Sequence, residues 1–470
     1  MAKQDKTPGE LLAEQLCYKP ENAGILMEEK ELKEAFDFCE GYKTFLDKAK
    51  TEREAVEYTE VLLKKRGYRL YDPEKTYRPG DKVYLNNRGK ALIFAAIGKQ
   101  SLSHGVRIVA SHIDSPRIDL KQRPLYEEAQ LAMLKTHYYG GVRKYQWVTI
   151  PLALHGVIIK KDGTAVQVCV GESEDDPIFC INDLLPHLSR EQNKRTLNEG
   201  IKGEELNVLV GSLPFKDDKA SEQVKLRILK LLFEKFGVIE ADFLSAELCL
   251  VPAFKARDLG LDRSMVGAYG HDDRVCAYTS VMACLENHEP EYTWVNILAD
   301  KEETGSDGNT GLNSRFLEHF IQDLAHSQGL EGRHVLEKSE CLSADVNAAF
   351  DPTFPEVHEK KNASYLNYGA VMSKYTGSGG KGGTNDASAE FVGRIRRVFD
   401  EAGVIWQTAE LGKVDAGGGG TVAKFISRLG ADVVDIGVPV LSMHAPFEVV
   451  AKADVYSAYK AFEAFVANEK

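Results

Sequence analysis

The feature that most limits the fold of this chain is an alternation of strand-like and helix-like segments after about residue 240. Apolar runs rich in strand-forming residues predict strands at 243–252, 292–299, 340–345 and 432–442. Amphipathic patterns predict helices at 274–287, 313–327, 387–402 and 452–468. Strands that alternate with helices indicate an α/β sheet covered by helices on both faces.

The first part of the chain extends this pattern and is then interrupted. Amphipathic helices are expected within 27–66, and strands at 91–97 and 107–113. From about residue 121, short β-like runs and a polar stretch follow, with one helix expected at 224–237.

The chain has 470 residues, too many for one ordinary core. We therefore expect an inserted β-rich domain at 121–250 between the two parts of one α/β domain, at 1–120 and 251–470.

Composition limits the partners of the protein. The formal net charge is −12, which speaks against binding to nucleic acid or to an anionic membrane. No apolar run approaches the roughly 20 residues of a membrane helix, and the N-terminus lacks the apolar region of a signal peptide. A cytoplasmic protein with peptide or small-molecule partners is expected. Its eight cysteines form no CxxC pair and are expected as reduced thiols.

The segment Val295–Gly305 places two adjacent glutamates, Glu302 and Glu303, where a buried strand gives way to a glycine-rich turn. Ligands of α/β sheets bind at such strand ends. Two neighbouring carboxylates repel each other unless a cation or a proton lies between them. A solvated acidic turn is the plain alternative.

Five stretches place His, Asp or Glu beside a strand end or a helix start: SHID at 111–114, GHDDR at 270–274, KEETG at 301–305, LSAD at 342–345 and LSMHA at 441–445. Each alone has an ordinary structural explanation, such as a hydrogen-bonded histidine or a helix N-cap. Together they supply two histidines and several carboxylates, a set that suits two divalent ions bridged by one carboxylate.

These motifs, in this order, resemble the aminopeptidase I / aspartyl aminopeptidase family of dinuclear zinc metallo-aminopeptidases. SHIDSPR, GHDDR, KEETGS, SADVNAAFDP and PVLSMHAPFE are close matches, and the likeness extends from about Leu11 to the C-terminus. The resemblance implies a helix-covered mixed sheet of the zinc-exopeptidase type, with an inserted β-rich dimerisation domain. The Asp272-Asp273-Arg274 motif and the TGSGGKGGT loop look more like the bacterial branch.

The resemblance also implies roles for particular residues. One zinc ion is expected on His112, Asp272 and Asp345, and the other on Asp272, Glu303 and His444, so that Asp272 bridges both ions. Cobalt or manganese also suits such ligands. Glu302 is expected as the general base that takes a proton from the attacking water. Asp114 is expected to accept the second ring N–H of His112.

Two further expectations concern the local backbone. The Asp272-Asp273 peptide bond is expected to be cis, so that the bridging carboxylate points back at both ions. An extended backbone at Glu302 and Glu303 points these side chains to opposite faces, which separates the base from the ligand.

Two glycine-rich segments, 376–384 and 417–421, do not fit a phosphate-binding loop. Backbone contact with a peptide is the better explanation, with Gly418 and Gly419 lining the pocket. Lys374 is the candidate contact for an acidic substrate side chain, with plain solvation as its alternative.

His187 lies in the inserted domain, where a structural role is the ordinary explanation. In the family, a loop of this domain reaches the active site of the neighbouring subunit, and His187 matches its position. The resemblance further implies a homodimer that assembles into a homododecamer.

The sequence therefore predicts a metallo-aminopeptidase that removes N-terminal Asp or Glu, or a neutral residue such as Leu, from peptides. Another two-zinc hydrolase, such as a deacylase or carboxypeptidase, is the alternative within enzymes. A non-catalytic binding protein is disfavoured, because all of His112, Asp272, Glu302, Glu303, Asp345 and His444 are present.

Overall fold

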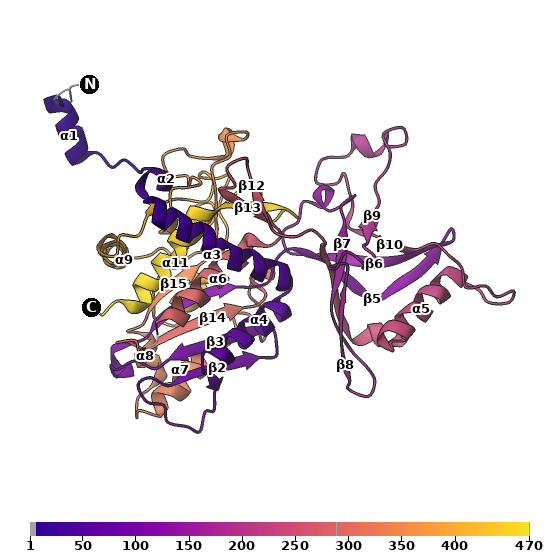
Figure 1. The fold of residues 1–470 in the computed structure, drawn as a ribbon, viewed down its shortest axis with the longest axis horizontal. Coiled ribbons are helices and arrows are strands. Elements are labelled where there is room, and N and C mark those ends of the chain that lie inside the picture. The colour runs from indigo at the N-terminus through magenta and orange to yellow at the C-terminus, as the bar shows by residue number, and fades with distance from the viewer. Residues whose placement is uncertain (1–5, 288, 470) are drawn as a thin grey trace.

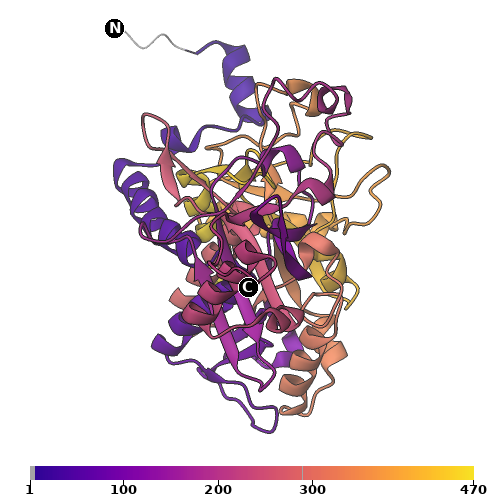
Figure 2. The same ribbon diagram turned by 90° about the vertical axis from the view of Figure 1, so that its right-hand side faces the viewer.

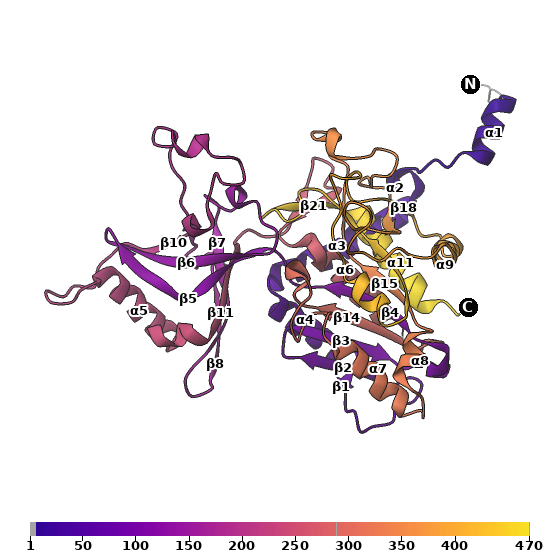
Figure 3. The ribbon, with the colours of Figure 1, turned by 180° about the vertical axis from the view of Figure 1, so that it is seen from behind.

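A computed structural model describes residues 6–287 and 289–469 of the chain. It has two lobes, each built around its own sheet, and we call them the large lobe and the small lobe (Figure 1, Figure 3). The α/β class predicted from the sequence is confirmed, with a mixed sheet in the large lobe.

The large-lobe sheet contains nine strands within the described residues, in the order β1-β2-β3-β14-β4-β15-β19-β17-β18. Its centre is parallel, because β14, β4, β15 and β19 pair in the same direction, whereas β3 and β17 join it antiparallel. The bounds are β1 Arg69–Leu70, β2 Lys82–Asn87, β3 Ala91–Ala96, β4 Arg107–His112, β14 Trp294–Ala299, β15 Glu340–Ala344, β17 Ala370–Ser373, β18 Trp406–Thr408 and β19 Asp432–Gly437.

Helices cover both faces of this sheet. One face packs against α3 Glu29–Lys48, α4 Glu52–Lys65, α6 His271–Glu286, α9 Ala389–Glu401 and α11 Lys452–Ala467. The other face packs against α7 Phe316–His326, α8 Gly332–Leu336 and α10 Ala423–Ser427. Alternate strand residues divide between the two cores: Val109 belongs to the first and Ile108 to the second, as expected for a strand buried on both faces.

The small lobe contains an antiparallel sheet of seven strands within the described residues, in the order β8-β7-β11-β5-β6-β10-β9. The bounds are β5 Arg117–Glu128, β6 Leu131–Tyr139, β7 Leu152–Ile159, β8 Ala165–Val170, β9 Cys180–Ile181, β10 Val208–Gly211 and β11 Ala246–Pro252. Helix α5, Gln223–Phe236, packs on this sheet. We propose that this lobe is the insertion expected at 121–250.

One predicted strand belongs to a different sheet from the one expected. The run 243–252 was expected to begin the α/β alternation, but its strand, β11, pairs with β7 and β5 of the small lobe. An apolar run shows that a strand is buried without showing which sheet it joins, so this placement could not be read from the pattern.

The remaining elements are short or peripheral. They are α1 Pro8–Leu16, α2 Ala23–Leu26, a sheet of β12 Arg257–Leu259, β13 Met265–Ala268 and β21 Glu448–Ala451, and the pair β16 Asn347–Ala348 and β20 Pro439–Val440. Helix α1 stands away from the rest, next to the N-terminus marked in both views, and buries no residue (Figure 1, Figure 2). Among the described residues, no helix has the length and apolar character needed to cross a membrane.

Candidate functional site

The predicted site residues meet at the carboxyl ends of the central parallel strands. His112 is the last residue of β4, and Asp345 directly follows the neighbouring strand β15. Glu302 and Glu303 follow β14, on the other side of β4. Adjacent parallel strands end at the same edge of a sheet, so these side chains gather there.

Asp272 lies at the centre of the cluster. Its Oδ1 lies 3.2 Å from His112 Nε2, and its Oδ2 lies 3.1 Å from His444 Nε2. The two oxygens of one carboxylate therefore face two different histidines, an arrangement suited to a bridging ligand.

The other predicted ligands lie around the same centre. His444 Nε2 is 3.5 Å from Glu303 Oε1, and His112 Nε2 is 3.9 Å from Asp345 Oδ1. Ligand atoms of Asp272, Glu303 and His444 all lie within 4.8 Å of one another. Glu302 Oε2 is 4.0 Å from His112 Nε2, so this carboxylate also borders the cluster.

Asp273 competes with Asp272 as a ligand, because Asp273 also forms a compact group with His112 and Asp345. We favour Asp272, whose two oxygens face the two histidines, whereas Asp273 Oδ2 accepts the backbone N–H of His112 at 3.4 Å. The Asp272-Asp273 peptide bond is cis, which confirms the prediction from the sequence.

The backbone at the two glutamates differs from the expectation. Glu302–Thr304 forms a 3₁₀ turn, η6, rather than an extended strand end, and Lys301 before it has a positive φ of 70°. The alternation of faces expected for Glu302 and Glu303 is therefore wrong. A glycine-rich turn can close into 3₁₀ geometry, and the sequence pattern did not distinguish the two outcomes.

Asp114 has more partners than the expected one. His112 Nδ1 lies 3.3 Å from Asp114 Oδ1 and 3.1 Å from the Asp114 backbone oxygen. The Asp114 carboxylate also accepts the backbone N–H groups of Glu302 and Glu303, at 3.1 and 3.2 Å. One buried carboxylate thus orients a histidine and the turn that carries both glutamates.

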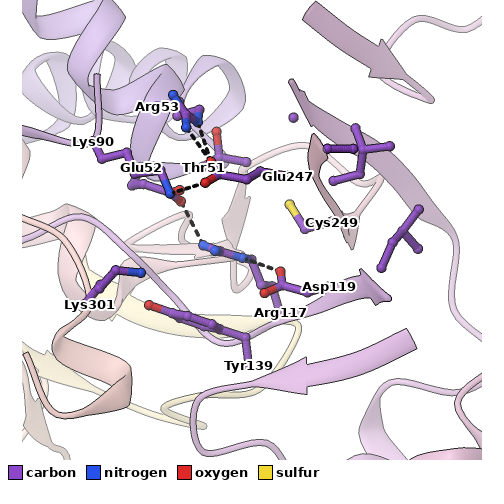
Figure 4. Close-up of a pocket in the computed structure, with 14 residues that line it drawn as sticks. Thr51, Glu52, Arg53, Lys90, Arg117, Asp119, Tyr139, Glu247, Cys249 and Lys301 are labelled. Atoms are coloured by element: carbon purple, nitrogen blue, oxygen red, sulfur yellow. Dashed lines mark hydrogen bonds and ion pairs between the residues drawn. The ribbon is translucent and has the colours of Figure 1, made fainter. Parts of the chain in front are cut away.

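Tyr139 and Arg117, both labelled in Figure 4, support Asp114 from the small lobe. The Tyr139 hydroxyl donates to Asp114 Oδ2 at 2.7 Å, and the Arg117 guanidinium lies over the Tyr139 ring at 4.1 Å. Arg117 donates in turn to Glu52 of α4 and to Asp119, each at 2.8 Å. The site is thus tied to both lobes.

Sequence reasoning did not single out Glu448, which holds two predicted ligands in place. Its two oxygens accept the backbone N–H groups of His444 at 2.6 Å and of Asp272 at 3.1 Å. Glu448 stands in the PFE segment that follows His444, and its position within the motif was the available signal.

Gly140 and Gly141, between β6 and β7, were also missed. The Gly141 carbonyl lies 3.0 Å from His444 Nδ1, and a Cβ on Gly141 would lie 2.9 Å from the same nitrogen. A side chain at position 141 would displace His444, a predicted ligand, so this position requires glycine.

The electrostatics of the cluster reflect several carboxylates that are crowded together and largely buried. Burial raises the pKa of Glu302 to about 7 and raises the pKa of Glu303 and of Asp345 well above their usual range. Burial alone would lower the pKa of His444, but the Asp272 carboxylate outweighs it and raises that pKa to about 10. A cation among these carboxylates would relieve their mutual repulsion.

The residues fit a zinc centre. Asp272 Oδ1 and Glu303 Oε1 are buried and receive no aligned hydrogen bond from any described residue, so their lone pairs are free for a metal. Imidazole nitrogens with carboxylate oxygens are a donor set that zinc accepts.

A cavity of about 460 Å³ opens over the cluster. Gly418 and Gly419 line it, as expected, together with Asp272, Glu302, Glu303, Asp345 and His444. Gly418 has a φ of 107°, and a Cβ on it would lie 2.3 Å from the Gly377 carbonyl oxygen. The two glycine-rich segments therefore pack against each other, and only glycine fits.

The structure does not place Lys374 in the lining of this cavity. Its Nζ pairs with Asp386, which also pairs with Lys381. Lys424 of α10 is the only lysine or arginine among the described residues that line the cavity. Its Nζ lies 4.7 Å from the centre of the Phe425 ring, and no carboxylate among the described residues pairs with it. Lys424 stands three residues after GGGGT, and that nearness to a pocket loop was the only sequence signal.

His187 is exposed in the small lobe and does not line the cavity of its own subunit as the structure describes it. Its expected contact with a neighbouring subunit stays a prediction.

Comparison with known proteins gives consistent matches. The family model described as aminopeptidase I zinc metalloprotease (M18) matches residues 45–466. A Clostridium acetobutylicum protein named "Probable M18 family aminopeptidase 1" is 51% identical over 469 residues, which cover 98% of this chain and 100% of that protein. A Thermotoga maritima protein of the same name is 45% identical over 434 residues, covering 91% and 95%.

Solved structures agree in fold. The crystal structure of aminopeptidase I from C. acetobutylicum matches with a TM-score of 0.91 and 49% identity, covering 96% of this chain and 100% of the other. The structure of an S. cerevisiae mApe1 dodecamer matches with a TM-score of 0.74 and 22% identity, covering 93% and 97%, which shows a shared fold.

Proposed function

This chain belongs to the aminopeptidase I family of zinc metalloproteases (M18), and on that premise we propose that it removes N-terminal residues from peptides with two zinc ions. His112, Asp272 and Asp345 would hold one ion, and Asp272, Glu303 and His444 the other. The observation that carries the proposal is the central Asp272 carboxylate, whose two oxygens face His112 and His444 at 3.2 and 3.1 Å.

When bound, zinc supplies a Lewis acid that polarises the scissile carbonyl and lowers the pKa of a water molecule. Glu302 borders the predicted ligands, with its Oε2 4.0 Å from His112 Nε2, and that position suits a group that takes and returns a proton. Glu302 would take a proton from the attacking water and give it to the leaving amine. Asp114 holds the Glu302 backbone and orients His112.

For the substrate, we propose that Lys424 contacts the side-chain carboxylate of an N-terminal Asp or Glu. Lys424 lines the cavity, whereas Lys374 lies outside the lining and pairs with Asp386. The apolar lining near Lys424, which includes Leu411, Phe425 and Met443, would accept a neutral side chain such as Leu.

The test measures bound metal per subunit together with hydrolysis of Glu, Asp and Leu anilides, before and after chelation. The proposal expects two zinc ions per subunit, activity on free N-termini that chelation abolishes, and recovery with zinc. Faster cleavage of N-acyl groups or of C-terminal residues would instead support a deacylase or carboxypeptidase.

We also propose that the small lobe forms a dimer and that dimers assemble into a dodecamer; the matched S. cerevisiae mApe1 structure is a dodecamer. His187 is exposed on this lobe and would reach the partner's cavity. Light scattering gives the assembly mass. Mixing inactive Glu302→Gln subunits with His187→Ala subunits and reassembling them tests the contact in trans, because a native His187 from the inactive subunit should restore part of the activity.

A further inference from the structure

A second group of metal-ligating side chains lies where the two lobes meet, outside the proposed catalytic residues. Glu54 of α4, His155 of β7 and Cys169 of β8 each offer one ligand atom, and these atoms lie within 4.8 Å of one another. His155 and Cys169 are cross-strand partners. All three residues line a cavity of about 640 Å³, through which a hydrated ion can reach them.

Glu54 is held with one oxygen directed at the histidine. Its Oε2 accepts the backbone N–H groups of Lys50 and Thr51, each at 3.0 Å, as part of the capping box of α4. This arrangement leaves Oε1 facing His155 Nδ1 at 2.7 Å. The carboxylate is therefore positioned by the helix start rather than free to turn into solvent.

The other ring nitrogen of His155 is also fixed. Nε2 lies 3.0 Å from Glu172 Oε1, and Glu172 pairs with Lys50 and Lys255, each at 2.7 Å. Histidines that bind metal through one nitrogen usually donate the other N–H to a carboxylate, as here. The two lysines lie against Glu172, beyond Nε2.

We propose that Glu54, His155 and Cys169 form a third metal site, separate from the catalytic pair, that binds a zinc-like divalent cation. Binding would release the thiol proton of Cys169 and the proton shared between Nδ1 and Glu54. The thiolate and the Glu54 carboxylate then supply two negative charges for a dication, and water would complete four-coordination. Thiolate and imidazole ligands favour zinc over magnesium or calcium.

The site would join the lobes, because Glu54 belongs to the large lobe and His155 and Cys169 to the small lobe. Arg117 and Tyr139 connect the small lobe to Asp114. A metal clamp at this junction would hold the small lobe against the helix that also carries Glu52, a partner of Arg117.

The experiment uses the full-length assembled protein, stripped of metal and refilled with Co²⁺ in steps. The predicted catalytic ligands include no cysteine, so a sulfur-to-cobalt charge-transfer band can report the third site alone. We expect this band in the wild type, with one more metal ion per subunit than in Cys169→Ser, which should lack the band. Anilide hydrolysis by Cys169→Ser should equal that of the wild type.

Cys17 gives the matched control, because it too is exposed and Cys17→Ser should keep the band. Equal metal content in the wild type and Cys169→Ser, or a band that survives in Cys169→Ser, would overturn the proposal. Neither result depends on whether the catalytic pair is assigned correctly.

Discussion

At the residue scale, the adjacent glutamates Glu302 and Glu303 have different surroundings although both lie on η6. Glu303 Oε1 lies 3.5 Å from His444, deep in the cluster, whereas the Glu302 side chain is more exposed, at 19% against 3%. Both backbone N–H groups donate to Asp114. A fixed turn, rather than strand alternation, would therefore separate a proton carrier from a metal ligand.

This separation can be tested by paired substitutions. Glu302→Gln keeps the shape but removes the proton acceptor, so kcat should fall by about 10² to 10⁴ while bound metal stays unchanged. Glu303→Gln should lower bound metal as well as kcat, with partial rescue by excess zinc. Metal analysis and kcat are measured on both variants. Metal loss in Glu302→Gln but not in Glu303→Gln would reverse the two roles.

Lys424 and Lys374 give a second matched pair. Lys424→Gln should lower kcat/KM for Glu anilides by about one to two orders of magnitude, because a charge-assisted contact contributes roughly 1.5 to 3 kcal/mol. Leu anilides should change little. Lys374→Gln, whose native side chain pairs with Asp386, should leave the Glu-to-Leu ratio unchanged. If the Glu-to-Leu ratio of kcat/KM falls in Lys374→Gln but not in Lys424→Gln, Lys374 is the substrate contact, as expected from the sequence.

At the element scale, the sequence predicted most of what positions the site. Strands β4, β14 and β15 have apolar runs that end in polar residues, so both the strands and their functional ends were visible. The cis bond was expected from the resemblance, in which the bridging carboxylate must point at both ions. Turn η6 and the sheet joined by β11 were not visible, because each depends on contacts with distant segments.

The hydrogen bonds that support the predicted site residues could not be predicted from the sequence, for a physical reason. Glu448 accepts the backbone N–H of Asp272, 176 residues away, and Tyr139 donates to Asp114, 25 residues away, and no local pattern encodes these two hydrogen bonds.

Tyr139→Phe tests whether the small lobe positions the site through Asp114. The change removes only the hydroxyl donor at 2.7 Å, so the fold and metal content should remain. We expect kcat to fall by about 3- to 30-fold, consistent with loss of a hydrogen bond worth roughly 0.5 to 2 kcal/mol, with little change in KM. Tyr145→Phe, at an exposed position of the same lobe, is the control. An unchanged kcat would show that Asp114 needs no support from this lobe.

At the scale of the whole molecule, an ion cluster around Asp258 connects segments from both ends of the chain. The Asp258 carboxylate pairs with Lys43 of α3 at 2.7 Å, with Lys452 of α11 at 2.9 Å and with Arg263 at 2.8 Å. Lys452 is only 1% exposed, and Asp258 is the carboxylate that pairs with it. Burial would raise the pKa of Asp258, but the three cations outweigh it and hold that pKa well below the usual value of 3.8.

A lowered pKa in the folded state gives a pH dependence with a definite sign. The unfolded carboxyl takes up a proton near pH 3.8 while the folded one stays ionised, so the cluster stabilises the fold above that pH and loses its contribution as the pH falls below it.

Asp258→Asn should lower the thermal midpoint near pH 7, since it leaves Lys452 buried without a counter-charge, at a cost of about 1 to 3 kcal/mol. The gap to the wild type should stay constant down to about pH 5 and narrow below about pH 4. Asp37→Asn, which removes only an exposed pair with Lys33, should shift the midpoint little at any pH. Thermal unfolding of the three proteins is measured across this pH range. If the difference in midpoint between the wild type and Asp258→Asn widens in acid, or if the two midpoints are equal at pH 7, this cluster does not stabilise the packing of α3 against α11.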